Sequence, residues 1–238
     1  MPIEGKTALV TGGSKGIGFG IARELIKKSV KVMVTSRNQA EAREAADRLN
    51  KLGGAEVVGV QADVRDYPSQ EQAVKNLLDK WGQLDILVAN AGVGRFGPIE
   101  TMTHGQWNDT IDTNLTGVFN SVKASLDALI KSKGYIITIS SLAGTNFFAG
   151  GAAYNASKFG LTGFTQSIML DLRKHGVKVS TIMPGSVATH FNDHVPDASD
   201  GWKIQTEDIG QLVVDLLEMP PRALPSKVEI RPSQPPGK

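Results

Sequence analysis

The 238-residue chain contains no cysteine, which excludes disulfide bonds and thiolate chemistry. Its formal net charge is only +2, and Lys and Arg are spread along the chain, so nothing indicates a nucleic-acid-binding surface. No apolar run approaches the length that crosses a bilayer, and the N-terminus has no basic region followed by a signal-length apolar stretch. We therefore expect a cytoplasmic protein with no membrane or nucleic-acid partner.

The chain has instead a regular alternation of short apolar runs and longer segments with the apolar spacing of helices. The expected strands are Lys6–Thr11, Lys31–Ser36, Glu56–Gln61, Leu84–Ala89, Gly134–Ser140, Val177–Met183 and Lys227–Ile230. The expected helices are Gly16–Lys28, Gln39–Leu52, Ser69–Trp81, Thr103–Lys131, Ala153–Lys174 and Glu207–Glu218. Within Thr103–Lys131 we expect two helices that join near Asn114.

Strands that are continuous apolar runs, separated by helices, indicate a parallel sheet covered on both faces. We expect an α/β, doubly wound (Rossmann) three-layer sandwich with a central, mostly parallel seven-stranded sheet. No linker-like shift in composition and no internal repeat divides the chain, so one domain over residues 1–238 is expected, with a Pro-rich tail at 231–238. Ligands of such folds bind at the carboxyl ends of the strands.

The loop after the first expected strand, Thr11–Gly18 (TGGSKGIG), is rich in glycine. Glycines allow a tight turn and close approach to a pyrophosphate, and the following helix offers free N–H groups and the positive end of its dipole. The G-x-S-x-G pattern of hydrolases also fits, but no earlier loop could supply its oxyanion donor. A P-loop is excluded because Phe19 stands where that motif needs Lys. The loop predicts a nucleotide phosphate site.

The second expected strand ends with Thr35, Ser36 and Arg37, and no carboxylate stands at that end to hold the ribose 2′-hydroxyl of NAD. Arg37 can pair with a 2′-phosphate through two N–H groups, and Lys15 could reach the same phosphate. The alternative is that both are solvated surface cations. The absence of Asp or Glu favours NADP(H).

Tyr154 and Lys158 stand four residues apart near the start of a long expected helix, so they share one face. An ammonium beside a phenol lowers the phenol pKa from about 10, which allows proton donation to an alkoxide or removal from an alcohol. A Tyr packed over a Lys stem is the alternative. Ser141, at the end of the fifth strand, can bond a substrate oxygen, and the side-chain amide of Asn114 can hold a water.

Taken together, these motifs resemble those of the short-chain dehydrogenase/reductase family, in order along nearly the whole chain. The matches are T-G-x-x-x-G-I-G at Thr11–Gly18, Asp63-Val64, N-A-G at Asn90–Gly92, N-x-x-G at Asn114–Gly117, Ser141, Tyr154 with Lys158, and P-G-x-x-x-T at Pro184–Thr189. The pattern is similar to that of 3-oxoacyl-carrier-protein reductases and 3-hydroxy acid dehydrogenases.

The resemblance implies that Tyr154 is the general acid/base and that Lys158 tunes it and binds the nicotinamide ribose. It implies that Ser141 orients the substrate carbonyl and that Asn114 holds a water in a proton relay. Hydride would pass between the nicotinamide and the substrate carbon. The expected cofactor-binding residues are Gly12, Ser14, Lys15, Gly16, Ile17, Gly18, Ser36, Arg37, Asp63, Val64, Asn90, Ala91, Gly92, Tyr154, Lys158, Pro184, Gly185, Val187 and Thr189.

The substrate-covering segment that follows the P-G-x-x-x-T motif is short here, at residues 190–206, and the chain end is similar to relatives that act on 3-hydroxy acids or serine. We expect a ketone, with 3-oxoacyl thioesters among the candidates, beside Ser141, Tyr154 and Phe191. The alternatives are a 3-hydroxy acid or serine-type dehydrogenase and a non-catalytic dinucleotide-binding sensor. His190 and His194 lack a clear third ligand, so no metal is expected. The resemblance also implies a homotetramer or homodimer.

Overall fold

The computed structural model describes residues 3–234, and the last four residues of the predicted Pro-rich tail lie outside them. Seven strands form one sheet in the order β3-β2-β1-β4-β5-β6-β7, and every adjacent pair is parallel. They are β1 (Thr7–Val10), β2 (Lys31–Ser36), β3 (Val57–Gln61), β4 (Ile86–Ala89), β5 (Tyr135–Ile139), β6 (Lys178–Pro184) and β7 (Lys227–Ile230). The predicted doubly wound fold is confirmed, and the sheet is wholly parallel.

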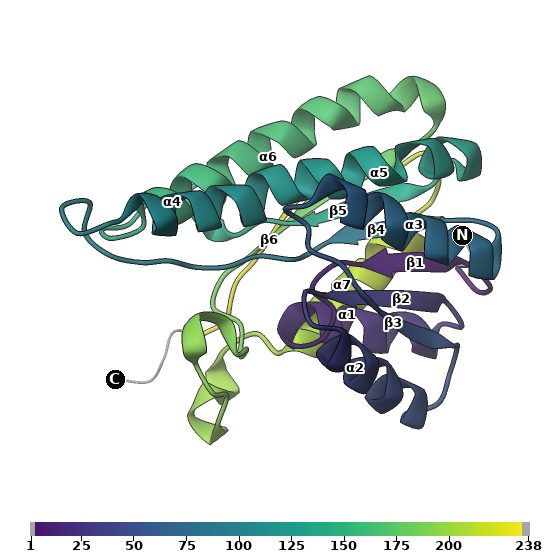
Figure 1. Ribbon diagram of the computed structural model, residues 1–238, viewed down its shortest axis with the longest axis horizontal. Coiled ribbons are helices and arrows are strands. Elements are labelled where there is room, and N and C mark those ends of the chain that lie inside the picture. The colour runs from purple at the N-terminus through teal and green to yellow at the C-terminus, as the bar shows by residue number, and fades with distance from the viewer. Residues whose placement is uncertain (1–2, 235–238) are drawn as a thin grey trace.

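Helices cover both faces of this sheet. They are α1 (Gly16–Lys27), α2 (Gln39–Lys51), α3 (Tyr67–Trp81), α4 (His104–Ile111), α5 (Gly117–Ser132), α6 (Ala152–Leu172) and α7 (Thr206–Glu218). One core cluster joins α1, α2 and α7 to the sheet, and a second joins α3, α5 and α6 to its opposite face (Figure 1). The three layers of the predicted sandwich are therefore present.

Neighbouring residues of the central strands enter opposite cores. On β1, Ala8 and Val10 pack in the first cluster and Leu9 packs in the second. Side chains of a strand alternate between the faces of a sheet, so burial of both faces requires an apolar residue at every position. This is why the strands are continuous apolar runs in the sequence.

The expected join near Asn114 is a π-helical turn. The residues Asp112–Thr116 form this turn between α4 and α5. A π turn interrupts the regular helical hydrogen-bond pattern and is common at functional sites. The interruption brings Asn114, which is fully buried, to the edge of the sheet where the strands end.

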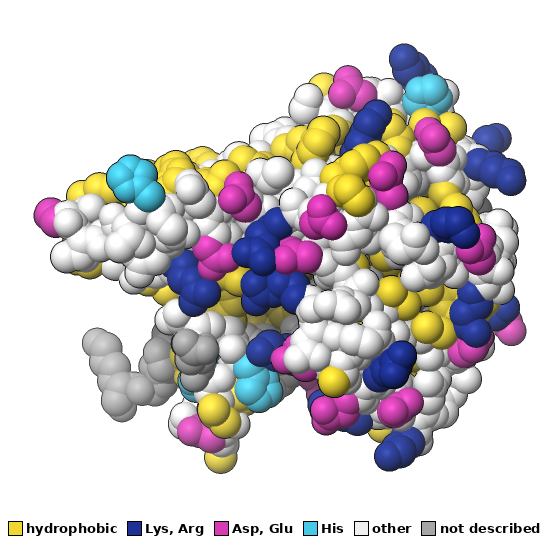
Figure 2. Space-filling model, viewed as in Figure 1, with side chains coloured by type: hydrophobic (Ala, Val, Ile, Leu, Met, Phe, Trp, Pro, Cys, Tyr) yellow, Lys and Arg dark blue, Asp and Glu magenta, His cyan; other side chains and the backbone are white. Residues whose placement is uncertain are grey.

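The substrate-covering segment, residues 190–206, stands apart from the sheet as the yellow-green segment at the lower left of Figure 1. It holds two short 3₁₀ turns, Phe191–Asp193 and Ala198–Trp202. Ala188 N donates to the Ile204 carbonyl at 2.9 Å, which closes the base of the segment. Figure 2 shows a hollow between this segment and the α4 end of the molecule. None of the described helices is both long and apolar enough to span a membrane.

Candidate active site

The glycine-rich loop between β1 and α1 has a shape that requires its glycines. Gly12 and Gly16 have φ values of 63° and 57°, in the left-handed region that favours glycine. A Cβ on Gly18 would lie 2.5 Å from the Gly12 carbonyl oxygen and 2.6 Å from Asn90 Nδ2. A side chain at Gly18 would therefore force the loop apart.

Asn90, at the end of β4, ties this loop to the neighbouring strand. Its Nδ2 donates to the carbonyl oxygens of Thr11 and Gly12 at 2.9 and 3.1 Å. Thr11 Oγ1 in turn accepts from the backbone N–H groups of Asn90 and Ala91 at 3.0 and 3.2 Å. The Asn90 amide thus shapes the site by holding the loop.

The N-terminus of α1 fits the pyrophosphate of a dinucleotide. Lys15 is the N-cap residue, and no described side chain caps the helix there. The first-turn N–H groups are therefore available to a ligand, and the positive end of the helix dipole favours an anion. The predicted contacts Ser14, Gly16, Ile17 and Gly18 all lie in this loop or in the first turn.

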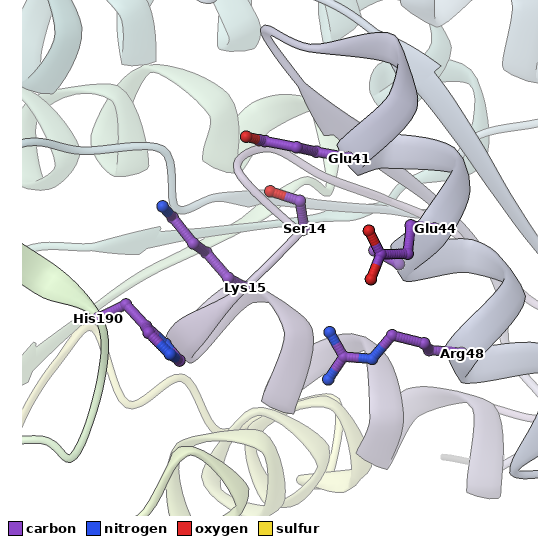
Figure 3. Close-up of a pocket in the computed structure, with 7 residues that line it drawn as sticks. Ser14, Lys15, Glu41, Glu44, Arg48 and His190 are labelled. Carbon is purple, nitrogen blue, oxygen red and sulfur yellow. The ribbon is translucent and has the colours of Figure 1, made fainter. Parts of the chain in front are cut away.

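A pocket of about 240 Å³ opens beside the loop (Figure 3). It is lined by Ser14, Lys15, Glu41, Glu44, Ala45, Arg48 and His190. Glu41 Oε2 accepts a hydrogen bond from Ser36 Oγ at 2.9 Å. The prediction that no carboxylate stands at this strand end is wrong, because the first turn of α2 brings Glu41 back to the end of β2. Arg37, the residue after Ser36, is exposed and does not line this pocket.

Asp63 and Val64, which the family resemblance assigns to an adenine site, lie in the loop after β3. The Asp63 carboxylate accepts from Arg65 Nε at 3.0 Å and from Arg65 NH2 at 2.6 Å, and this pairing lowers the pKa of Asp63. Val64 is buried, and its carbonyl accepts from Asn120 Nδ2 at 2.9 Å. Arg65 was not identified from the sequence, although a cation two residues after Asp63 is the signal that could have indicated it.

The structure brings Ser141, Tyr154 and Lys158 together at the carboxyl end of β5. Tyr154 lies in the first turn of α6 and hydrogen-bonds Ser141, whose Oγ also accepts from Ala143 N at 3.1 Å. Lys158 Nζ lies 5.7 Å from the centre of the Tyr154 ring and donates to the Ile139 carbonyl at 2.9 Å. The predicted catalytic helix face is therefore formed.

Burial is the largest cause of the pKa shifts of Tyr154 and Lys158. It raises the pKa of Tyr154, and the hydrogen bond with Ser141 lowers that pKa by less. Burial also lowers the pKa of Lys158 to about 8. The expected net lowering of the Tyr154 pKa is therefore not found in the protein alone, because burial outweighs the interactions that favour the phenolate.

The Asn114 side chain fixes the loop that follows β4. Its Nδ2 donates to the Val93 carbonyl at 2.9 Å and to Ser157 Oγ at 3.0 Å, and its Oδ1 accepts from Val93 N at 2.8 Å. A Cβ on Gly92 would lie 3.2 Å from that Oδ1 and 3.8 Å from Lys158 Nζ. Both ends of the amide are engaged by the protein, so Asn114 positions the loop after β4, and its expected hold on a water stays a prediction.

The segment that follows β6 runs against the glycine loop. Gly185 N donates to the Ile230 carbonyl at 2.8 Å, which anchors the turn after Pro184. A Cβ on Gly16 would lie 3.5 Å from Thr189 Cβ, so these two predicted cofactor contacts are neighbours. Val187 bridges to Ile204 and links the segment to the substrate-covering residues.

Aromatic side chains surround Tyr154. Its ring centre lies 5.3 Å from that of Phe96 and 5.8 Å from that of Phe191, and Phe96 is also 5.8 Å from Phe148. A cavity of about 530 Å³ adjoins Phe148 and is lined by Gly97, Pro98, Ile99, Glu100, Phe147, Phe148, Ala149, Gly150, Ala152 and Asn155. Phe191 was predicted to face substrate, whereas Phe96 was missed because only the fold brings its loop to Tyr154.

No three His, Asp or Glu side chains gather as a metal site within the described part of the chain. The His194 ring instead bonds the Asp200 carboxylate, with Nε2 and Oδ2 2.5 Å apart. His190 lies at the pocket beside Lys15.

A doubly wound sheet, a glycine loop at the first helix and a Tyr–Lys pair at the strand ends define a dinucleotide-dependent oxidoreductase. Residues 6–200 match the family model described as short chain dehydrogenase. The chain belongs to the short-chain dehydrogenase family.

Relatives and solved structures agree with this membership. The chain is 39% identical over 198 residues to a 3-oxoacyl-[acyl-carrier-protein] reductase of Salmonella typhimurium, covering 83% of this chain and 80% of that protein. An alcohol dehydrogenase from Thermococcus sibiricus, complexed with 5-hydroxy-NADP, superposes with a TM-score of 0.91 at 27% identity, over 98% of this chain and 99% of that one. A metagenomic short-chain oxidoreductase in complex with NADP superposes with a TM-score of 0.85 at 35% identity, over 99% of this chain and 100% of that one.

Proposed function

We propose that this chain interconverts a ketone and a secondary alcohol with NADP(H), and that Tyr154 carries the proton. The observation that carries the proposal is the convergence of Ser141, Tyr154 and Lys158 at one strand end, beside an uncapped helix N-terminus that fits a pyrophosphate. The predicted cofactor and reaction class are confirmed, since relatives are named as 3-oxoacyl reductases and similar structures are described with NADP.

In the reductive direction, the chemistry that a bound NADPH would supply is hydride transfer to the carbonyl carbon. Tyr154 donates its proton to the carbonyl oxygen, and the Ser141 hydroxyl donates a hydrogen bond to the same oxygen. Lys158 holds a positive charge 5.7 Å from the Tyr154 ring centre and stabilises the phenolate that remains. In the oxidative direction the same phenolate removes the proton of the alcohol.

Asn114 supports this machinery from outside the reacting atoms. It fixes Val93, whose loop leads to Phe96 on the Tyr154 ring, and it bonds Ser157, the neighbour of Lys158. We assign it as a positioning residue. Asp63 and Val64, at the end of β3, would hold the adenine, and Pro184–Thr189 would hold the nicotinamide carboxamide.

The cavity beside Phe148 favours a neutral, apolar ketone or an oxoacyl group over a hydroxy acid. Among the described residues that line it, the one charged side chain is Glu100. A carboxylate substrate would meet that negative charge without a compensating cation. A purely dinucleotide-sensing role is disfavoured because Asn114, Ser141, Tyr154 and Lys158 are all present.

We further propose a cytoplasmic homo-oligomer, either dimer or tetramer, that associates through α5 and α6. Three large apolar side chains on these helices, Phe119, Phe159 and Leu170, are exposed by 43–58%. Surface of this kind is characteristic of contacts between subunits. Light scattering coupled to size-exclusion chromatography would test the association, and a monomer at micromolar concentration would contradict it.

The function is tested by following NADPH oxidation with ketones, 3-oxoacyl thioesters and 3-oxo acids, and NADP⁺ reduction with 3-hydroxy acids and serine. Tyr154→Phe should reduce turnover by more than about 100-fold while NADPH binding, measured by its fluorescence, is retained. Turnover within tenfold of the unmodified chain would overturn the assignment of Tyr154.

A further inference from the structure

Glu41 occupies a place in the cofactor site that its position on α2 does not suggest. Its Oε2 accepts from Ser36 Oγ at 2.9 Å, and Ser36 is the last residue of β2 and is only 9% exposed. In folds of this class the carboxyl end of the second strand meets the adenosine ribose, and a carboxylate there accepts the 2′-hydroxyl of NAD. The end of β2 therefore presents a carboxylate, delivered from the following helix.

The same pocket also holds Lys15, one of the two cations expected at a 2′-phosphate, and a second cation, Arg48, that was not expected there. Lys15 and Arg48 line it together with Glu41. Figure 3 shows the Glu41 carboxylate extending toward the Ser14 hydroxyl, on the side of the pocket where Lys15 points, while Glu44 and Arg48 lie further along α2. A 2′-phosphate at this strand end would meet Lys15 and Arg37 favourably and Glu41 unfavourably.

We infer that Glu41 is a cofactor-specificity residue, which accepts the ribose 2′-hydroxyl of NADH and opposes the 2′-phosphate of NADPH. The inference rests on the proposed NADP(H)-dependent function. It means that the chain binds NADH as well as NADPH, and that Glu41 sets the ratio of the two affinities.

A purely local role for Glu41 makes a different prediction. Glu41 is the acidic residue in the first turn of α2, where Asn38 already caps the helix by accepting from Ala40 N at 2.8 Å. A negative charge there also stabilises the helix through its dipole. If that were its whole role, neutralising Glu41 would alter thermal stability and leave the affinity ratio unchanged.

The test is the dissociation constant of NADPH and of NADH, measured by nucleotide fluorescence on the full chain without substrate. Glu41→Gln removes the charge and keeps the size of the side chain. It should tighten NADPH roughly three- to tenfold at low salt, because one opposing charge is lost, and the gain should shrink as salt screens it. NADH should weaken by roughly two- to fivefold, because a charge-assisted hydrogen bond becomes a neutral one.

Asp47→Asn is the matched control, since it removes the same charge from an exposed residue of the same helix that does not line the pocket. It should change the NADPH-to-NADH affinity ratio by less than a third of the change caused by Glu41→Gln. Equal effects of the two variants, or an unchanged ratio in a folded Glu41→Gln protein, would overturn the inference. Failure of the unmodified chain to bind either nucleotide would instead overturn the proposed function.

Discussion

Two buried charges, Asp200 in the substrate-covering segment and Lys158 on α6, have opposite surroundings. The Asp200 side chain, 5% exposed in the substrate-covering segment, meets Lys203 Nζ at 2.6 Å and His194 Nε2 at 2.5 Å. Lys158 is 5% exposed, and within the described chain its ammonium makes one hydrogen bond, to the Ile139 carbonyl, and no ion pair.

The consequences for protonation differ accordingly. Hydrogen bonds from Lys203 and His194 lower the pKa of Asp200 to about 2, so its charge is stabilised by folding. Burial lowers the pKa of Lys158 to about 8, so its charge is destabilised by folding. A buried charge without a counter-charge is costly, and such groups cluster at functional sites. The comparison therefore separates a charge that holds structure from one that is kept for chemistry.

The largest expected effect is on turnover. Lys158→Met should reduce kcat by about 100-fold to 10,000-fold, because Tyr154 loses the cation that stabilises its phenolate. Steady-state kinetics with the best ketone from the screen would measure this. Lys174→Met, which changes an exposed lysine after the same helix, is the control and should retain kcat within twofold. A Lys158→Met enzyme within tenfold of the unmodified chain would remove Lys158 from the mechanism.

The second effect is on the pH dependence of stability. The pKa of Lys158 is about 8 in the folded chain against an ordinary 10.5, so the unfolded chain binds more protons between these values. The free energy of unfolding should therefore gain on the order of 3 kcal/mol from this group as pH rises from 8 to 10.5. Urea titrations should show the rise in the unmodified chain and a smaller one in Lys158→Met. Parallel curves would contradict the assignment.

Asp200 also makes the chain more stable as pH rises, but because folding stabilises its charge instead of destabilising it. Its pKa is about 2 in the folded chain against an ordinary 3.8, so its contribution to stability is complete above pH 3.8 and is lost as pH falls through 2. Asp200→Asn should loosen residues 190–206 at neutral pH and raise KM for the ketone roughly five- to tenfold, with faster proteolysis in that segment. Asp215→Asn, on the exposed face of α7, is the control. An unchanged KM and cleavage rate would show that Asp200 does not hold the segment.

The smallest effect is expected at the aromatic wall. Phe191→Leu removes ring contacts with Tyr154 and Phe96, at 5.8 and 6.3 Å between centres. Aromatic pairs contribute about 0.5–1.5 kcal/mol beyond area burial, so KM for an apolar ketone should rise roughly two- to tenfold. If KM rose equally for a small polar ketone, the wall would not be a substrate surface.

The sequence predicts the fold because the pattern of apolar residues depends on burial, which is complete for the central strands β1, β4 and β5. It also predicts the join at Asn114 and the catalytic face of Tyr154 and Lys158, since these are local spacings. Contacts between elements were not predictable in this way. Glu41 reaches Ser36 only because α2 turns back over the end of β2.

The pKa of Tyr154 is a second property that local spacing in the sequence could not predict. The spacing to Lys158 predicts a cation beside a phenol, but it does not predict that both are shielded from water or that the Ile139 carbonyl takes the ammonium. Burial depends on the whole fold, and here it reverses the direction of the shift. Phe96 was missed for the related reason that its partner, Tyr154, is distant in sequence.

The central claim is that Lys158 is retained for catalysis at a cost to stability, and the free energy of unfolding at neutral pH tests it most directly. Urea unfolding of the chain without nucleotide should show Lys158→Met to be more stable than the unmodified protein by on the order of 1–3 kcal/mol, since an uncompensated buried charge is replaced by an apolar side chain of similar length. A Lys158→Met protein that is folded but less stable than the unmodified chain would contradict the account.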